Sequence, residues 1–162
     1  MPAGPLAHVC FLVRDLDRAI EDWRRILGVL DPAQLEEQIV RYDRFEAGDD
    51  EMAWATFVNP AGCEIQLLSP LNDGPLGRRL ERHGEGVHHI AFTNPQLPEA
   101  VQQLVEAGVK VTSTELTQDP ILPWQHWTFV APESSHGLLV EVAYPYTPVE
   151  GRWEPGPGVE PA

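Results

Sequence analysis

The spacing of apolar residues near the start of the chain predicts an amphipathic helix. The apolar positions at intervals of three and four are Leu16, Ile20, Trp23 and Leu27. Residues spaced in this way share one helix face and can pack on a core. Asp15 suits the N-cap in front of this stripe, and Gly28 suits a stop behind it. We therefore expect a helix that ends at about Leu27.

The same reasoning places the other elements. A second helix is expected from near Pro98, a residue type favoured in the first helical turn, to a stop at Gly108, and a short third one from Leu76 to His83. Five segments rich in β-branched and aromatic residues, bounded by Pro or Gly, are typical of strands. They are residues 50–58, 63–68, 109–115, 124–130 and 138–143.

An internal repeat organises these elements into two halves. LAHVCF near the start resembles VHHIAF, which aligns His8 with His89 and Ala7 with His88. TFVNP and GCEIQLLSP recur later as TFVAP and GLLVEVAYP, which aligns Gln66 with Glu141. A repeat of this length indicates two copies of one supersecondary unit that share a core.

We expect one domain over residues 1–146. It comprises a first module at about residues 5–70, a linker at 71–85 and a second module at about 86–145. Residues 147–162 are rich in Pro and Gly, and we expect a surface tail without regular elements.

The charge excludes some partners. The 162-residue chain has a formal net charge of -14. Nucleic acids and anionic membranes need a cationic surface, so neither is expected as a partner, whereas a small-molecule substrate is. The first residues, MPAGPLAHVCFLVRD, lack the basic region and long apolar run of a signal peptide, and we expect a cytoplasmic protein.

The repeat brings four polar residues to matched positions. If the two modules pair about a pseudo-twofold axis, His8, Gln66, His89 and Glu141 converge from the first and last strands of each copy. Two imidazoles, an amide oxygen and a carboxylate suit a divalent metal such as Co, Mn, Zn, Ni or Fe, with positions left for a substrate. A single strand histidine is more often a hydrogen-bonded core residue, and the repeat is what favours ligation.

The adjacent pair His88 and His89 poses a question, because neighbouring strand side chains point to opposite faces. The repeat sets His89 against His8 and His88 against Ala7. We therefore expect His89 to be the ligand and His88 to face away under the helix layer. Replacing His88 should then chiefly change stability.

At this point the chain resembles the vicinal oxygen chelate superfamily, which includes glyoxalases, bleomycin resistance proteins and dioxygenases. The resemblance covers about residues 6–145, and LAHVCFLVRDLDRAIEDW, IQLLSPL, GEGVHHIAF and TFVAPESSHGLLVEV are most similar to the methylmalonyl-CoA epimerase branch. It implies an α+β fold in which two βαβββ modules pair to form a cupped mixed sheet around a metal site, with the helices outside. It also implies His8, Gln66, His89 and Glu141 as the metal ligands and a homodimer as the assembly.

The resemblance further implies a metal-dependent isomerase that removes a proton beside a thioester carbonyl. Glu141 would then be a catalytic residue as well as a ligand. Glu37 is the second catalytic candidate, because LEEQIV resembles an acidic Glu-Gln-Gly stretch of the family, although Ile39 replaces the Gly. An ordinary solvated charge at Glu37 is the competing interpretation.

Other functions stay open at this stage. They are a glyoxalase I-type lyase, an Fe(II) dioxygenase that uses two histidines and a carboxylate, and a non-catalytic protein that binds small molecules. The arginines Arg78, Arg79 and Arg82 suit either CoA phosphates or a solvated helix face. Metal analysis of the purified protein best separates the enzymes from the binding protein.

Overall fold

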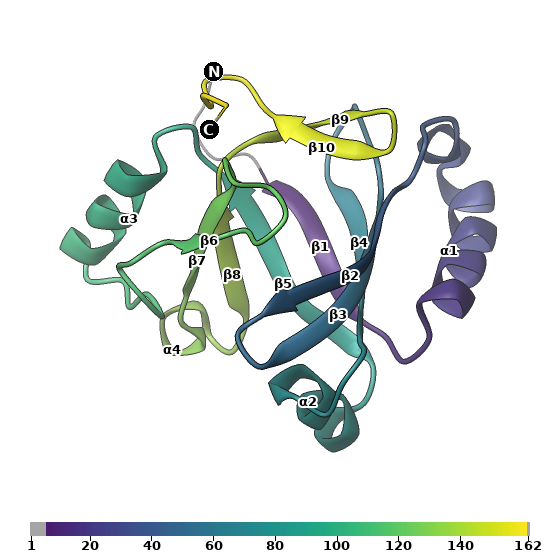
Figure 1. Ribbon diagram of the computed structural model, residues 1–162, viewed down its shortest axis with the longest axis horizontal. Coiled ribbons are helices and arrows are strands. Elements are labelled where there is room, and N and C mark those ends of the chain that lie inside the picture. The colour runs from purple at the N-terminus through teal and green to yellow at the C-terminus, as the bar shows by residue number, and fades with distance from the viewer. Residues whose placement is uncertain (1–5, 162) are drawn as a thin grey trace.

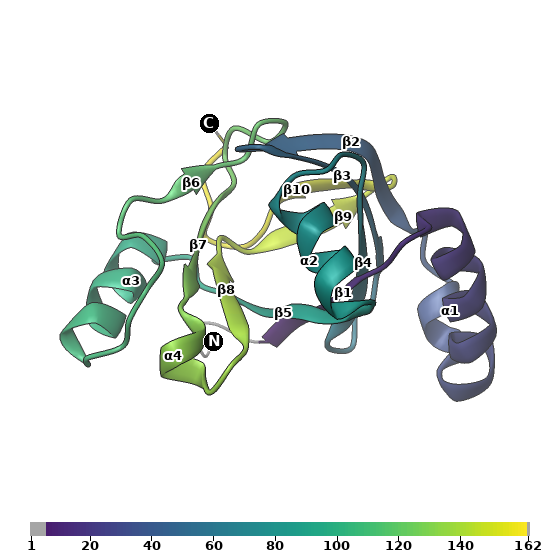
Figure 2. The ribbon, with the colours of Figure 1, turned by 90° about the horizontal axis from the view of Figure 1, so that it is seen from below.

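The computed structural model describes residues 6–161 and consists of a strongly curled mixed sheet, with α1 and α3 on its outer side and α2 on its concave side (Figures 1 and 2). Its elements in chain order are β1 (Leu6–Leu12), α1 (Leu16–Leu30), the 3-10 helix η1 (Pro32–Leu35), β2 (Val40–Ala47), β3 (Asp50–Phe57), β4 (Glu64–Pro70), α2 (Pro75–His83), β5 (Gly86–Thr93), α3 (Leu97–Glu106), β6 (Thr117–Gln118), β7 (His126–Val130), α4 (Pro132–Ser135), β8 (Leu139–Ala143), β9 (Tyr146–Val149) and β10 (Arg152–Pro155).

The sheet has the strand order β2-β3-β4-β1-β5-β8-β7-β6. β1 is parallel to β4, β5 is parallel to β8, and β1 and β5 pair antiparallel at the centre. Each half therefore repeats the same arrangement, and the two halves join within one chain through β1 and β5. The expected fold class, a cupped mixed sheet with outer helices, is confirmed.

Each central strand contains one β-bulge. In the pairing of β1 with β5, Leu6 lies opposite Phe92 and His8 opposite Ala91, so Ala7 is an extra residue on β1. Further along, Cys10 lies opposite His89 and Phe11 opposite Val87, so His88 is an extra residue on β5. A bulge bends the strand and changes the direction of nearby side chains. The two extra residues are the pair that the internal repeat aligns.

The convex face of the sheet packs under α1 and α3. Leu67 is fully buried in a cluster with the apolar face of α1, and Ile65 packs against that cluster. Val142 is buried in a second cluster with α3, and Val140 packs against it. The opposite, concave face is therefore the one that presents His8, Gln66 and Glu141.

The two long helices begin where the sequence predicts. The side chain of Asp15 accepts a hydrogen bond from the backbone N–H of Arg18 at 3.0 Å and caps α1. The predicted end at Gly28 is wrong, because α1 continues to Leu30. α3 ends before Gly108, whose φ of 82° is the left-handed conformation that favours glycine after a helix.

Two other expectations are wrong. Residues 109–115, expected as a strand, form none and make a single bridge, from Val111 to Val130. A strand that was not predicted is β2, because charged residues hide the alternation of its apolar positions. The Pro/Gly-rich tail is not irregular, because β9 and β10 form a hairpin across one end of the sheet (Figure 1).

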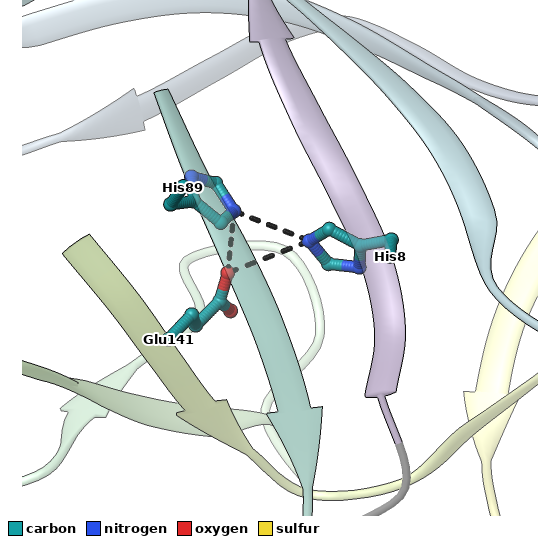
Figure 3. A group of neighbouring side chains, drawn as sticks. All are labelled: His8, His89 and Glu141. Atoms are coloured by element: carbon teal, nitrogen blue, oxygen red, sulfur yellow. Dashed lines mark hydrogen bonds and ion pairs between the residues drawn. The ribbon is translucent and has the colours of Figure 1, made fainter. Parts of the chain in front are cut away.

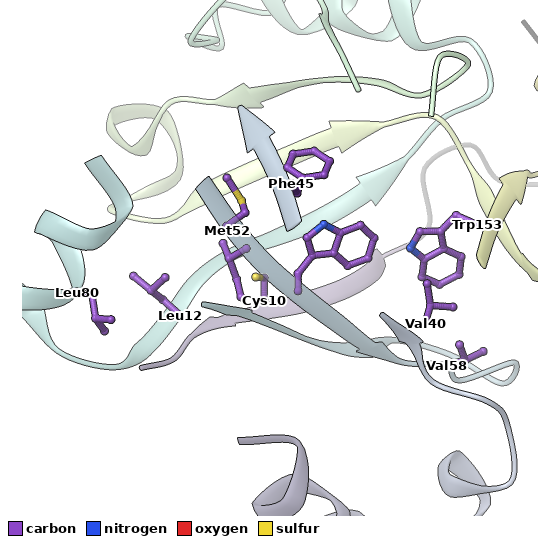
Figure 4. Packing of buried hydrophobic residues seen from close by; sticks show 10 residues of the cluster. Cys10, Leu12, Val40, Phe45, Met52, Val58, Leu80 and Trp153 are labelled. Atoms are coloured by element: carbon purple, nitrogen blue, oxygen red, sulfur yellow. The ribbon is translucent and has the colours of Figure 1, made fainter. Parts of the chain in front are cut away.

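That hairpin takes part in the core on the concave side. Trp153 of β10 is 5% exposed and belongs to a cluster with Cys10, Trp54 and Leu68 (Figure 4). Its backbone N–H also donates to the hydroxyl of Tyr42 at 3.2 Å. The C-terminal hairpin therefore covers one end of the concave face.

No helix among residues 6–161 has the length and apolar character needed to cross a bilayer.

Candidate metal centre

Three of the four predicted ligands converge on the concave face of the sheet (Figure 3). Oε2 of Glu141 lies 2.8 Å from Nε2 of His89 and 3.6 Å from Nε2 of His8. The two Nε2 atoms are 3.2 Å apart, and the side chains of His8 and His89 are 5% and 7% exposed. Central strands β1 and β5 hold the histidines, and β8 holds the glutamate. The convergence expected from the repeat is therefore present for His8, His89 and Glu141.

The electrostatics of the group favour a positive charge between these atoms. Burial raises the pKa of the Glu141 carboxyl, but the nearby imidazoles of His8 and His89 outweigh burial and hold the pKa below its ordinary value. Burial lowers the pKa of His89, whereas Cys10 and the Glu141 carboxylate raise it, to about 9. Two imidazole nitrogens and one carboxylate oxygen are a donor set that suits a divalent cation of the Zn, Co, Ni, Mn or Fe type.

The fourth predicted ligand, Gln66, lines the same cavity as the other three. Its amide nitrogen donates to Oγ1 of Thr56 at 3.3 Å. This bond uses the half of the amide that cannot bind a cation, and so it is compatible with a metal-binding role for the amide oxygen. Gln66 as a ligand stays a proposal.

A tyrosine of the C-terminal hairpin contacts His8, the first of the predicted ligands. The hydroxyl of Tyr146 lies 2.7 Å from Nδ1 of His8 and donates to Oε1 of Glu64 at 3.1 Å. Burial raises the pKa of Glu64 to about 7, although the hydrogen bond from Tyr146 lowers it in part. Sequence reasoning missed both residues. Glu64 shares a strand face with Gln66, which was a usable signal, whereas Tyr146 lies where no regular element was expected.

His88 does not face away from the site, and this expectation is wrong. It lines the cavity, and its Nδ1 lies 2.8 Å from Nδ1 of His89. The reason is the bulge, which removes the strict alternation that the prediction assumed. Burial, together with the charges of His89 and Arg79, lowers the pKa of His88 to about 3. Nδ1 of a neutral His88 can accept a hydrogen bond from Nδ1–H of His89, and this tautomer leaves Nε2 of His89 free for a cation.

Glu37 is not brought to the site. It lies in the exposed segment between η1 and β2, and its side chain is not part of the cavity lining. The acidic residues that do line the cavity are Asp50, Asp119 and Glu141. Of these, Glu141 alone contacts the imidazoles of His8 and His89.

The candidate metal-binding group of His8, His89 and Glu141 lies in the wall of a cavity of about 460 Å³. Aromatic side chains form much of the remaining wall, including Phe45, Trp54, Trp124, Trp127, Phe129 and Trp153. A second cavity on α2, of about 470 Å³, is lined by Pro75, Arg78, Arg79, Arg82 and His83 and is called the arginine groove below. Pro75 and Arg79 line both cavities, so the two are adjacent.

Comparison with known proteins gives a consistent family. The model of the Glyoxalase/Bleomycin resistance protein/Dioxygenase superfamily matches residues 7–120. An ethylmalonyl-CoA/methylmalonyl-CoA epimerase of Cereibacter sphaeroides is 29% identical over 146 residues, which cover 86% of this chain and 96% of the relative.

Solved structures show the same fold. A methylmalonyl-CoA epimerase from Mycobacterium tuberculosis is 24% identical with a TM-score of 0.69, and the match covers 89% of each chain. A methylmalonyl-CoA epimerase in complex with methylmalonyl-CoA and NH4+ is 23% identical with a TM-score of 0.67, and the match covers 88% of this chain and 95% of that one.

Proposed function

Because the chain belongs to the Glyoxalase/Bleomycin resistance protein/Dioxygenase superfamily, we propose that it is a metal-dependent isomerase of an acyl-CoA. The reaction proposed is removal of the proton beside the thioester carbonyl. Methylmalonyl-CoA is the first substrate to test, since relatives along most of the chain carry that activity in their names.

The observation that carries the proposal is the convergence of two buried imidazoles and one carboxylate in the wall of a cavity. His8, His89 and Glu141, with the amide oxygen of Gln66, are the residues that would hold the cation. When bound, a divalent cation supplies positive charge that stabilises the enolate formed as the proton leaves.

Glu141 is the residue proposed to accept the proton. Its contacts with His8 and His89 both use Oε2, so Oε1 stays available. Its lowered pKa keeps the carboxylate ionised near neutral pH, which is the form that accepts a proton. Glu37 has no part in this mechanism, because its side chain is exposed and outside the cavity.

Exchange of the α-proton tests the proposal. Protein reconstituted with Co(II) is incubated with methylmalonyl-CoA in D2O, and deuterium at the α-carbon is followed by mass spectrometry. We expect exchange with the unchanged protein and at least a hundredfold slower exchange with Glu141→Gln. A Glu37→Gln variant is the matched control and should exchange at the normal rate. Lack of exchange by metal-loaded protein with this and with other acyl-CoA thioesters would refute the proposed activity.

The expectations of a homodimer and a cytoplasmic location stay predictions. Light scattering on the purified protein tests the first, and cell fractionation tests the second.

A further inference from the structure

The cavity beside the metal-binding group has a wall made largely of aromatic rings. Phe45 and Trp54 are 7% and 9% exposed, and their ring centroids lie 6.3 Å apart in an edge-to-face arrangement. Trp127 packs on Phe45 at 6.1 Å, and Trp153 packs on Tyr146 at 4.4 Å. Rings that hold one another in this way form a stiff surface that suits a flat apolar group.

The size of this cavity favours a bulky ligand. A volume of about 460 Å³ lies within the range of about 300–1,000 Å³ typical of sites for drug-sized molecules. A small acyl group such as methylmalonyl would leave most of the apolar wall without a partner. An empty apolar volume contributes nothing to affinity, whereas filling it removes apolar surface from water.

The charges of the wall favour an uncharged acyl group. Within the part of the chain that the structure describes, Arg79 is the one Lys or Arg side chain of the cavity lining, and it lies where the cavity meets the arginine groove. The lining also contains Asp50 and Asp119. A second carboxylate that projected toward the rings would therefore meet apolar or acidic side chains, which is costly.

The arginine groove gives the ligand a direction. Arg78 and Arg82 line it together with Arg79, which is shared with the cavity. An anionic carrier is attracted to this end, and the part of the ligand beyond the carrier then enters the aromatic cavity. The two cavities are adjacent, because Pro75 and Arg79 line both, and we expect a thioester to reach from one to the other past these two residues.

We propose that the acyl group of the substrate is bulky, uncharged and aromatic, and that it stacks on the wall formed by Phe45, Trp54 and Trp127. This inference rests on the proposed function for the position of the carbonyl. It concerns which acyl group the protein prefers and can be tested by binding alone.

The test compares phenylacetyl-CoA with methylmalonyl-CoA by isothermal titration calorimetry on the full chain reconstituted with Co(II). We expect phenylacetyl-CoA to bind at least tenfold more tightly. Trp127→Leu should reduce this preference to about twofold, and Trp127→Phe, which keeps a ring, should retain most of it. Trp23→Leu is the matched control, because Trp23 packs against Phe11 with the α1 cluster and lies outside the cavity.

Two outcomes would overturn the inference. One is equal or tighter binding of methylmalonyl-CoA, and the other is an unchanged preference in both Trp127 variants. Deuterium exchange on the same thioesters separates this inference from the proposed function. Tighter binding of phenylacetyl-CoA, with no exchange on any of the thioesters, would refute the isomerase and leave the acyl preference standing. Exchange only on methylmalonyl-CoA, together with tighter binding of methylmalonyl-CoA than of phenylacetyl-CoA, would support the isomerase and refute the acyl preference.

Discussion

The hydroxyl of Tyr146 lies 2.7 Å from Nδ1 of His8, across 138 positions of the chain. In the proposed site, His8 would hold a cation through Nε2 with the proton on Nδ1, and the Tyr146 oxygen can accept a hydrogen bond from Nδ1–H while its O–H donates to Glu64. The hydrogen bond therefore fixes both the tautomer and the orientation of His8.

Removal of this hydroxyl should weaken metal binding. We expect Tyr146→Phe to lower the affinity for Co(II) or Zn(II) by about 10- to 100-fold, the usual effect of losing an outer partner of a ligand histidine. Competition with a chromogenic chelator measures the change. Tyr144→Phe is the control, and Glu64→Gln should keep most of the affinity because the amide oxygen still accepts from Tyr146. Equal loss in Tyr144→Phe would contradict the assigned role.

The two adjacent histidines should differ in degree. His89→Ala removes a ligand and should abolish measurable metal binding. His88→Ala removes only the acceptor of the Nδ1 proton of His89, so we expect an affinity about 10- to 100-fold lower with binding still measurable. Metal stoichiometry after dialysis checks both variants. Full metal binding by His89→Ala would show that the register of β5 is wrong.

Metal binding should depend on pH in a defined direction. Because the pKa of His89 is raised to about 9, this imidazole is protonated at neutral pH and must release a proton to bind a cation. The apparent affinity should therefore rise about tenfold per pH unit toward pH 9.

The same shift affects the metal-free protein, whose stabilisation by protonated His89 is fully present below about pH 6.5 and lost as the pH rises through 9. Calorimetry of metal binding at pH 7 in buffers of different ionisation enthalpy should show about one proton released per cation. Binding without proton release would disprove the protonated state.

The C-terminal hairpin should contribute to stability. Trp153 is 5% exposed, and its replacement by Ala leaves a cavity in the core, which should lower the free energy of unfolding by about 3–5 kcal/mol. Urea denaturation measures the loss. Leu30→Ala is the control at a large apolar residue that is 77% exposed, and it should change stability by less than about 0.5 kcal/mol. Similar losses in both variants would mean that the hairpin does not pack as described.

The sequence was most informative where two signals agreed. The family resemblance implied the curled sheet, and the internal repeat predicted the meeting of His8, His89 and Glu141. The position of His88 was not predictable from alternation, because a bulge is a property of the pairing between two strands. Tyr146 was missed for a different reason. Its role depends on a hairpin whose Pro and Gly residues hide the signal, and whose stability comes from the burial of Trp153.

The paired bulges have a consequence for how such a site can diverge. Both halves of the sheet keep the same backbone irregularity, beside His8 in one and beside His89 in the other, but the extra residue is Ala7 in the first and His88 in the second. A substitution at either position alters the surroundings of one imidazole and leaves the ladder pairs of the sheet unchanged. A duplicated ancestor could thus adjust the basicity of its two nitrogen donors separately, one side chain at a time.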